Sequence, residues 1–239
     1  MPVYIVTGAS RGLGLEFVKQ IFASGNTVFA CARHPQGSKE LLSMIDNKNV
    51  FGIKMDTTDI DSIKAAAKEI EKNAPSGVNV LINNAGISGN KNYNILNTPE
   101  SDYINVFKTN VCGVTNVTQE FLPLLRKSGQ DKIKKIMNIS SLHGSISKMQ
   151  DGNGNGYGSA YCISKAALNM VTKMLSNELA KENFIVYSST PGWCQTDMGT
   201  SKASLRPEDS IKAQLANLDG LTLKDTGIYL EYNGNIAPW

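Results

Sequence analysis

The sequence has few cysteines, few histidines and no long apolar run, and each shortage excludes a class of protein. Its 239 residues include four cysteines, far apart and without a Cys-x-x-Cys pair, and two histidines. We therefore expect no metal site, and dispersed thiols are typical of a reducing compartment. No apolar run approaches the ~20 residues that a membrane-spanning helix needs. The chain does not open on a basic segment with a cleavage site, so we expect no signal peptide and a cytoplasmic location.

Charge is also sparse and nearly balanced. Lysine and arginine total 24 and aspartate and glutamate 21, a net charge of +3. This balance argues against nucleic acid or an anionic membrane as the main partner. Hydrophobic residues make up 41% and charged residues 19%, which excludes a disordered chain or a coiled coil. A chain of this length buries roughly 70–75% of its unfolded surface, and we expect residues 1–239 to form a single domain.

Short β-rich runs alternate with helical patterns along the whole chain. Strands are predicted at 3–6, 27–32, 50–55, 78–82, 134–139 and 185–188, with a seventh candidate at 228–230. Helical patterns lie between them at 12–23, 38–46, 59–72, 101–127 and 160–181. This alternation predicts an α/β fold: a single Rossmann-like, doubly wound parallel sheet of about seven strands with helices on both faces.

A glycine-rich turn follows the first predicted strand. Residues 7–14 read Thr-Gly-Ala-Ser-Arg-Gly-Leu-Gly and lead into a helix. Glycines permit close approach of the backbone to a pyrophosphate, and a helix N-terminus offers free N–H groups. Such a turn can be purely structural, but its place after the first strand of a βαβ pattern predicts a dinucleotide site. The residues predicted to bind there are Gly8, Ser10, Arg11, Gly12, Leu13 and Gly14.

The second predicted strand indicates which dinucleotide is bound. A site for NAD usually places an acidic residue near the end of this strand, where it binds the ribose 2′-hydroxyl. Here no acid is present, and Arg33 follows the strand while Arg11 lies in the glycine turn. Both could be ordinary surface residues, but together they suit a 2′-phosphate and favour NADP(H). Asp56, after the third strand, could face the adenine; the helix beyond it would be capped by Thr58 or Asp59.

Tyr161 and Lys165 are four residues apart on a predicted helix, so they share a face. A tyrosine needs help to act as a base near pH 7, and a nearby ammonium stabilises its phenolate. The pair is therefore a candidate general acid/base, although a pair of side chains reaching along the surface is the alternative. Tyr157 lies nearby but lacks a lysine partner.

Two long predicted helices carry unusual apolar faces. Apolar residues of the helix at 160–181 spread over about 220° of the helical wheel, so we expect it to bury two faces, the second against a neighbouring helix or a partner subunit. Those residues are Ile163, Ala166, Ala167, Leu168, Val171, Met174, Leu175 and Leu179.

In the helix at 101–127 the apolar face is formed by Ile104, Phe107, Val111, Val114, Val117, Phe121 and Leu125. Asn110 projects into the same arc, either as a satisfied structural amide or as the organiser of a water chain.

Two serines end the predicted strand 134–139, where open α/β sheets bind their ligands. Ser141, or its neighbour Ser140, could bind a substrate carbonyl oxygen, although serines are also common in turns. His143 has no acidic neighbour in sequence and is expected only to line a pocket. The chain has no Gly-x-Ser-x-Gly elbow, which argues against a serine hydrolase.

Taken together, these residues resemble the short-chain dehydrogenase/reductase family over nearly the whole chain. Residues 7–14 look like its Thr-Gly-x-x-x-Gly-x-Gly coenzyme motif, and residues 83–86 look like its Asn-Asn-Ala-Gly motif. Residues 191–196 look like its Pro-Gly segment, and residues 232–239 resemble the carbonyl-reductase branch that includes sniffer and C-factor. The order of the family's catalytic tetrad is found here in Asn110, Ser141, Tyr161 and Lys165.

The resemblance implies an NADP-dependent oxidoreductase that reduces aldehyde or ketone carbonyls or runs the reverse reaction. Tyr161 would donate the proton to the carbonyl oxygen, and Lys165 would bind the nicotinamide ribose and lower the tyrosine pKa. Ser141 would position the carbonyl, and Asn110 would hold a relay water. The further residues implied to bind the cofactor are Asn84, Ala85, Gly86, Pro191, Gly192, Trp193 and Thr196.

Two points stay open at this stage. The alternative function is an NADP(H)-binding regulatory or signalling protein of the same fold without turnover, since fold alone does not secure function. The stretch between Ser141 and Tyr161 is longer than in many members of the family and contains the Gly/Asn run 151–156. That run could obstruct a dimer face, so a homodimer or homotetramer through the two long helices is expected but not assured.

Overall fold

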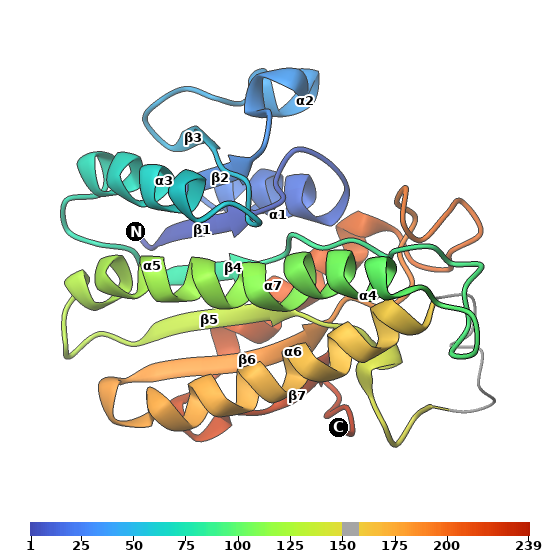
Figure 1. The fold of residues 1–239 in the computed structure, drawn as a ribbon. Coiled ribbons are helices and arrows are strands. Elements are labelled where there is room, and N and C mark those ends of the chain that lie inside the picture. Colours follow the sequence, from blue (N-terminus) through green and yellow to red (C-terminus); the bar gives the residue numbers. More distant parts are fainter. Residues whose placement is uncertain (150–157) are drawn as a thin grey trace.

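The computed structural model describes residues 1–149 and 158–239, and its centre is one seven-stranded parallel sheet (Figure 1). The strand order is β3-β2-β1-β4-β5-β6-β7, and every neighbouring pair is parallel. The strands are β1 Val3–Thr7, β2 Thr27–Ala32, β3 Val50–Lys54, β4 Val80–Asn83, β5 Lys134–Ile139, β6 Phe184–Thr190 and β7 Tyr229–Glu231. This arrangement confirms the predicted doubly wound α/β fold.

Helices cover both faces of the sheet. The α-helices are α1 Gly12–Ala23, α2 Lys39–Leu42, α3 Ile60–Asn73, α4 Glu100–Phe107, α5 Gly113–Lys127, α6 Ser159–Glu178 and α7 Pro207–Gly220. Shorter helical turns are η1 Pro35–Gly37, η2 Lys108–Cys112, η3 Leu142–Gly144, η5 Ala180–Glu182 and η6 Leu223–Asp225. Figure 1 shows α3, α5 and α6 in front of the sheet and α1 and α7 behind it. Each face has its own apolar core, with Phe17 and Ile211 in one and Ile63 and Phe121 in the other.

Two helix predictions need correction. The pattern at 38–46 forms only the four-residue α2, capped by Ser38, and then turns away toward β3. The helix α7 was not predicted at all. Pro207 starts it, as suits a first helical position, but polar Ser210 and Gln214 lie on its buried face. An apolar periodicity therefore does not reveal this helix.

The long helix predicted at 101–127 is interrupted by the π-helical turn η2. A π turn carries an extra residue, which rotates everything before it relative to everything after it. The buried face of α4 consequently runs through Val106, whereas Ile104 and Phe107 are exposed, contrary to prediction. Val114 and Phe121 in α5 are buried as predicted.

The second apolar face of α6 is uncovered in the single chain. Ile163, Met170 and Met174 are exposed, while Leu168 and Leu179 are buried. The run 151–156 and Tyr157 lie outside the described residues. Within the described part of the chain, none of the helices is long and apolar enough to cross a membrane, and no cluster of metal-binding side chains is found.

Candidate active site

The glycine turn between β1 and α1 forms an open cradle. Gly8 and Gly12 have φ angles of 67° and 55°, a conformation that favours glycine. A Cβ added at Gly14 would collide with the carbonyl oxygen of Gly8, so the turn closes tightly only without side chains. No side chain caps the start of α1, which leaves the first N–H groups of the helix open to an anion. Leu13 is partly buried and packs against the apolar core.

The Asn-Asn-Ala-Gly segment is fastened to this cradle. The side-chain amide of Asn84 donates to the carbonyl oxygens of Thr7 at 2.9 Å and Gly8 at 3.3 Å. In return, the Thr7 hydroxyl oxygen accepts from the N–H groups of Asn84 and Ala85, each at 3.0 Å. These bonds hold together the carboxyl ends of β1 and β4, between which the strand order reverses. Ligands of open α/β sheets bind at such a reversal.

The Pro-Gly segment, residues 191–196, lies beside the glycine turn. The carbonyl oxygen of Pro191 accepts a 2.7 Å bond from Ser210 on the unpredicted helix α7. A Cβ on Gly12 would lie 3.5 Å from the methyl group of Thr196, so this segment reaches the glycine turn. Arg11 forms an ion pair at 3.3 Å with Asp197, but both side chains are mostly exposed and such pairs contribute little.

Arg33 and Asp56 follow the neighbouring strands β2 and β3 at the carboxyl edge of the sheet. The Asp56 carboxylate accepts bonds from the N–H and hydroxyl of Thr58, at 2.9 and 2.8 Å. These bonds lower the pKa of Asp56, and the charge of Arg33 contributes to the same shift. Asp59 caps α3, which decides the alternative left open by the sequence. The side chain of Arg33 is exposed.

Tyr161 and Lys165 lie in the first two turns of α6, and both side chains are buried. The Lys165 ammonium donates to the carbonyl oxygen of Ile139 at 2.6 Å and lies 5.7 Å from the centre of the Tyr161 ring. Burial lowers the pKa of Lys165 to about 8. Because both side chains are buried, the pair does not reach along the surface, which excludes that alternative.

Asn110 lies in the π turn η2 and is fully buried. Its Nδ2 donates to the Ile87 carbonyl oxygen and to the Ser164 hydroxyl, both at 2.9 Å, and its Oδ1 accepts from the Ile87 N–H at 2.9 Å. A Cβ on Gly86 would lie 3.2 Å from Asn110 Oδ1 and 3.7 Å from Lys165 Nζ. The side chain of Asn110 is thus fully satisfied and lies beside Lys165, and π turns often occur at functional sites.

Ser141 and Ser140 have different environments. The Ser140 hydroxyl is buried and donates to Asn169 at 2.6 Å, so it is committed to the interior. Ser141 is only partly buried, and its hydroxyl oxygen accepts from the His143 N–H at 3.2 Å. The next turn presses on α6, because a Cβ on Gly144 would lie 2.6 Å from the backbone carbon of Lys165. The turn that follows Ser141 therefore packs against α6 at Lys165, and Ser141 is the serine whose hydroxyl is not committed to the interior.

His143 also lies at this site. Its ring centre is 6.5 Å from that of Tyr161, in an edge-on arrangement, and burial lowers its pKa. The imidazole is therefore neutral at neutral pH. A neutral ring beside the phenol is consistent with the expected role in lining a pocket.

The family model for short chain dehydrogenases matches residues 2–206. The chain belongs to this family. An uncharacterised oxidoreductase of Schizosaccharomyces pombe is 36% identical to this dehydrogenase over 256 aligned positions, covering 99% of this chain and 98% of the relative. The C-signal protein of Myxococcus xanthus is 37% identical over 162 positions, 68% of this chain and 93% of that protein.

Solved structures of carbonyl reductases resemble this dehydrogenase closely. The NADPH-bound carbonyl reductase from chicken fatty liver superposes with a TM-score of 0.91 and 35% identity, covering 100% of both chains. Carbonyl reductase Sniffer of D. melanogaster has a TM-score of 0.92 and 31% identity, covering 100% of this chain and 99% of that one.

Some residues that build this candidate site were not found from sequence. The Ser164 hydroxyl oxygen accepts a hydrogen bond from Asn110, and the Ser210 hydroxyl donates to the Pro191 carbonyl oxygen. Asp197 forms an ion pair with Arg11. Ser164 precedes Lys165 on the buried face of α6, so a polar residue among apolar neighbours was a usable signal. The carbonyl oxygen of Ile139 gives no signal, because every residue has one.

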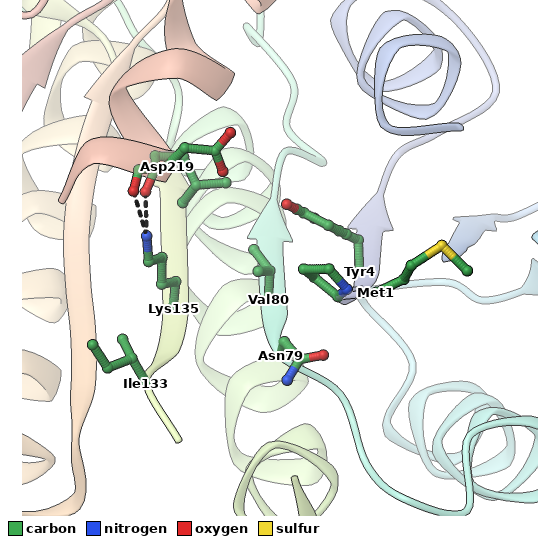
Figure 2. Close-up of a pocket in the computed structure, with 9 residues that line it drawn as sticks. Met1, Tyr4, Asn79, Val80, Ile133, Lys135 and Asp219 are labelled. Atoms are coloured by element: carbon green, nitrogen blue, oxygen red, sulfur yellow. Dashed lines mark hydrogen bonds between the residues drawn. The ribbon is translucent and has the colours of Figure 1, made fainter. Parts of the chain in front are cut away.

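A cavity of about 330 Å³ lies far from this site, at the amino-terminal edge of the sheet (Figure 2). Tyr4, Val80 and Asp219 are among its lining residues, and Lys135 donates there to the main-chain oxygens of Leu218 and Asp219. Burial and the charge of Asp219 raise the pKa of Tyr4 to about 12. Since the cradle and the Tyr161–Lys165 pair are at the carboxyl edge, this cavity is not part of the candidate active site.

Proposed function

We propose that residues 1–239 form one oxidoreductase domain that reduces aldehyde or ketone carbonyls with NADPH. The observation that carries this proposal is the buried Lys165 ammonium, hydrogen-bonded to Ile139 beside the Tyr161 phenol and next to the Asn110–Gly86 contact. The chicken neighbour, described as an NADPH-bound carbonyl reductase, supports the same activity. The reverse oxidation of an alcohol would use the same groups.

The residues present fit a dinucleotide phosphate. The turn has no side chain at Gly8, Gly12 and Gly14, and no side chain caps the start of α1. Both features suit the pyrophosphate. Arg33 and Arg11 suit a 2′-phosphate, since guanidinium groups bind phosphate oxygens with paired, charge-assisted hydrogen bonds. The Pro191–Thr196 segment, including Gly192 and Trp193, would hold the nicotinamide end.

Each catalytic residue has a separate task in this proposal. A bound nicotinamide supplies the hydride. The Ser141 hydroxyl orients the carbonyl oxygen, and the Tyr161 hydroxyl delivers the proton to it. The Lys165 ammonium stabilises the phenolate that remains, and Asn110 keeps the loop after β4 and the helix α6 in register beside it.

We further propose that two copies associate through α4, the first part of the long helix predicted at 101–127, and α6, as a homodimer or within a homotetramer. The exposed apolar side chains on these neighbouring helices are Ile104, Phe107, Ile163, Met170 and Met174. Exposed apolar patches of this kind mark association surfaces. Sedimentation of Met170→Glu and Met174→Glu against the parent chain tests this, and an unchanged mass for both would reject the proposed face. A cytoplasmic location fits the four free thiols.

The activity is tested by NADPH consumption with a panel of aldehydes and ketones. Tyr161→Phe should abolish turnover and leave NADPH binding within about two-fold, because only the transferable proton is lost. Tyr103→Phe on α4 is the matched control and should keep full activity. Tight NADPH binding with no carbonyl reduced would reject the enzyme and favour the regulatory alternative. An active Tyr161→Phe variant would reject the assigned role of this residue.

A further inference from the structure

Trp239 lies against the last strand of the sheet. Its ring stacks on that of Tyr229 in β7, with centres 5.2 Å apart and planes 27° apart. The N–H of Ala237 donates to the Tyr229 carbonyl oxygen at 2.8 Å, so residues 236–239 return alongside β7. Tyr229 is almost fully buried, and Trp239 covers it from outside.

The main-chain oxygen of Trp239 binds the segment that follows Ser141. It accepts from the Ser147 hydroxyl at 2.8 Å, the Ser147 N–H at 3.2 Å and the Ser145 hydroxyl at 3.3 Å. Ser145 is buried and comes directly after η3. Residues 140–147 are called the Ser141 turn below. Three donors on one oxygen fix the position of its carboxyl-terminal end, at Ser145 and Ser147.

The amino-terminal part of the Ser141 turn is held by Asn169 on α6. Ser140 donates to Asn169 at 2.6 Å, and the Asn169 amide donates to the Gly144 carbonyl oxygen at 3.3 Å. Ser141 and His143 therefore lie between two anchors, and Trp239 forms the one at Ser145–Ser147.

We infer that Trp239 is a positioning residue that holds the Ser141 turn in its reactive geometry. This inference rests on the proposed reductase function, in which Ser141 orients the carbonyl. The catalytic consequence can be large because a misplacement of about 1 Å can cost about 100-fold in rate. Within residues 1–149 and 158–239, the hydrogen bonds and ring contact of Trp239 run to Ser145, Ser147 and Tyr229, so cofactor affinity should not depend on it.

The kinetic test compares Trp239→Ala, Trp239→Phe and the double variant Trp239→Ala/Ser141→Ala in single-turnover reduction. We expect Trp239→Ala to slow the reaction about 10-fold with NADPH affinity within about two-fold, and Trp239→Phe, which keeps a ring on Tyr229, to restore most of the rate. In the Ser141→Ala background, Trp239→Ala should add less than about two-fold, because residues acting as a unit are not additive. Ile236→Ala, an exposed neighbour in the same segment, should match the parent chain. A full 10-fold loss in the Ser141→Ala background would overturn the inference.

The second measurement is independent of activity. Amide hydrogen exchange of residues 144–147 should quicken at least about 10-fold in Trp239→Ala and stay unchanged in Ile236→Ala. Unchanged exchange overturns the inference even if a carbonyl is reduced, whereas faster exchange in a chain that reduces no carbonyl rejects only the proposed function. If Trp239→Ala does not fold, Ser147→Ala provides the test, because it removes one donor from an exposed position. It should quicken exchange and slow the reaction about three-fold, and no effect on either would overturn the inference.

Discussion

Replacing Lys165 with methionine should remove a rise in stability with pH that the parent chain shows between pH 7 and pH 9.5. Burial lowers the pKa of Lys165 from 10.5 to about 8, so the folded chain releases this proton before the unfolded chain does. Between these two values the unfolded state binds more protons, and stability therefore rises with pH. Below pH 8 the buried ammonium beside Tyr161 lowers the free energy of unfolding by the full amount of this shift.

The magnitude follows from the shift in pKa. A shift from 10.5 to about 8 corresponds to about 3 kcal/mol when fully expressed, and about 2 kcal/mol of it is recovered between pH 7 and pH 9.5. Lys165→Met has no such group, so the parent chain should gain about 2 kcal/mol relative to the variant over this interval. The comparison cancels other titrating groups, and stopping at pH 9.5 avoids the unfolding that the raised pKa of Tyr4 favours at higher pH.

The assay is urea unfolding of both cofactor-free chains at pH 7 and pH 9.5. Methionine also leaves the Ile139 carbonyl oxygen without its donor, but this loss is the same at both pH values and drops out of the difference. A difference between the chains that does not change with pH, or that moves in favour of Lys165→Met at pH 9.5, would refute the reasoning.

Three further predictions concern the cradle and its neighbours. Gly14→Ala should weaken NADPH binding more than about 10-fold in a fluorescence titration, because the new methyl group collides with Gly8 and opens the turn; unchanged affinity would show that the turn does not hold the pyrophosphate. Arg33→Asp should lower the preference for NADPH over NADH by about 10- to 100-fold in kcat/KM, since it exchanges a phosphate partner for a repelling carboxylate; Lys54→Asp, at the exposed end of β3, controls for charge alone. Asn110→Ala should lower the free energy of unfolding by about 1–3 kcal/mol, because the Ile87 N–H and carbonyl groups lose their buried partner, and a variant as stable as the parent would contradict this bonding.

Much of the fold could be read from contiguous residues. The bounds of β2 and β5 coincide with the predicted runs. For β2 the reason is that a strand buried on both faces shows as a nearly continuous apolar segment. The glycine turn was also predictable, since its conformation depends on the absence of side chains within a few residues. By contrast, α7 escaped because its buried face carries Ser210 and Gln214, whose partners lie in distant segments.

The sequence by itself determined which groups could act: the spacing of Tyr161 and Lys165 on one helix face, the glycine turn, and the lack of an acid after β2. Only the tertiary structure decided how those groups are held. The π turn at Asn110 changes the phase of a helix that periodicity treats as regular, so Ile104 and Phe107 are exposed. The environment of Lys165 depends on the carbonyl oxygen of Ile139, and the Ser141 turn depends on Trp239, nearly one hundred residues later. Local patterns report the conformation of neighbouring residues, whereas burial and hydrogen-bond partners arise from contacts between segments that meet only in the folded chain.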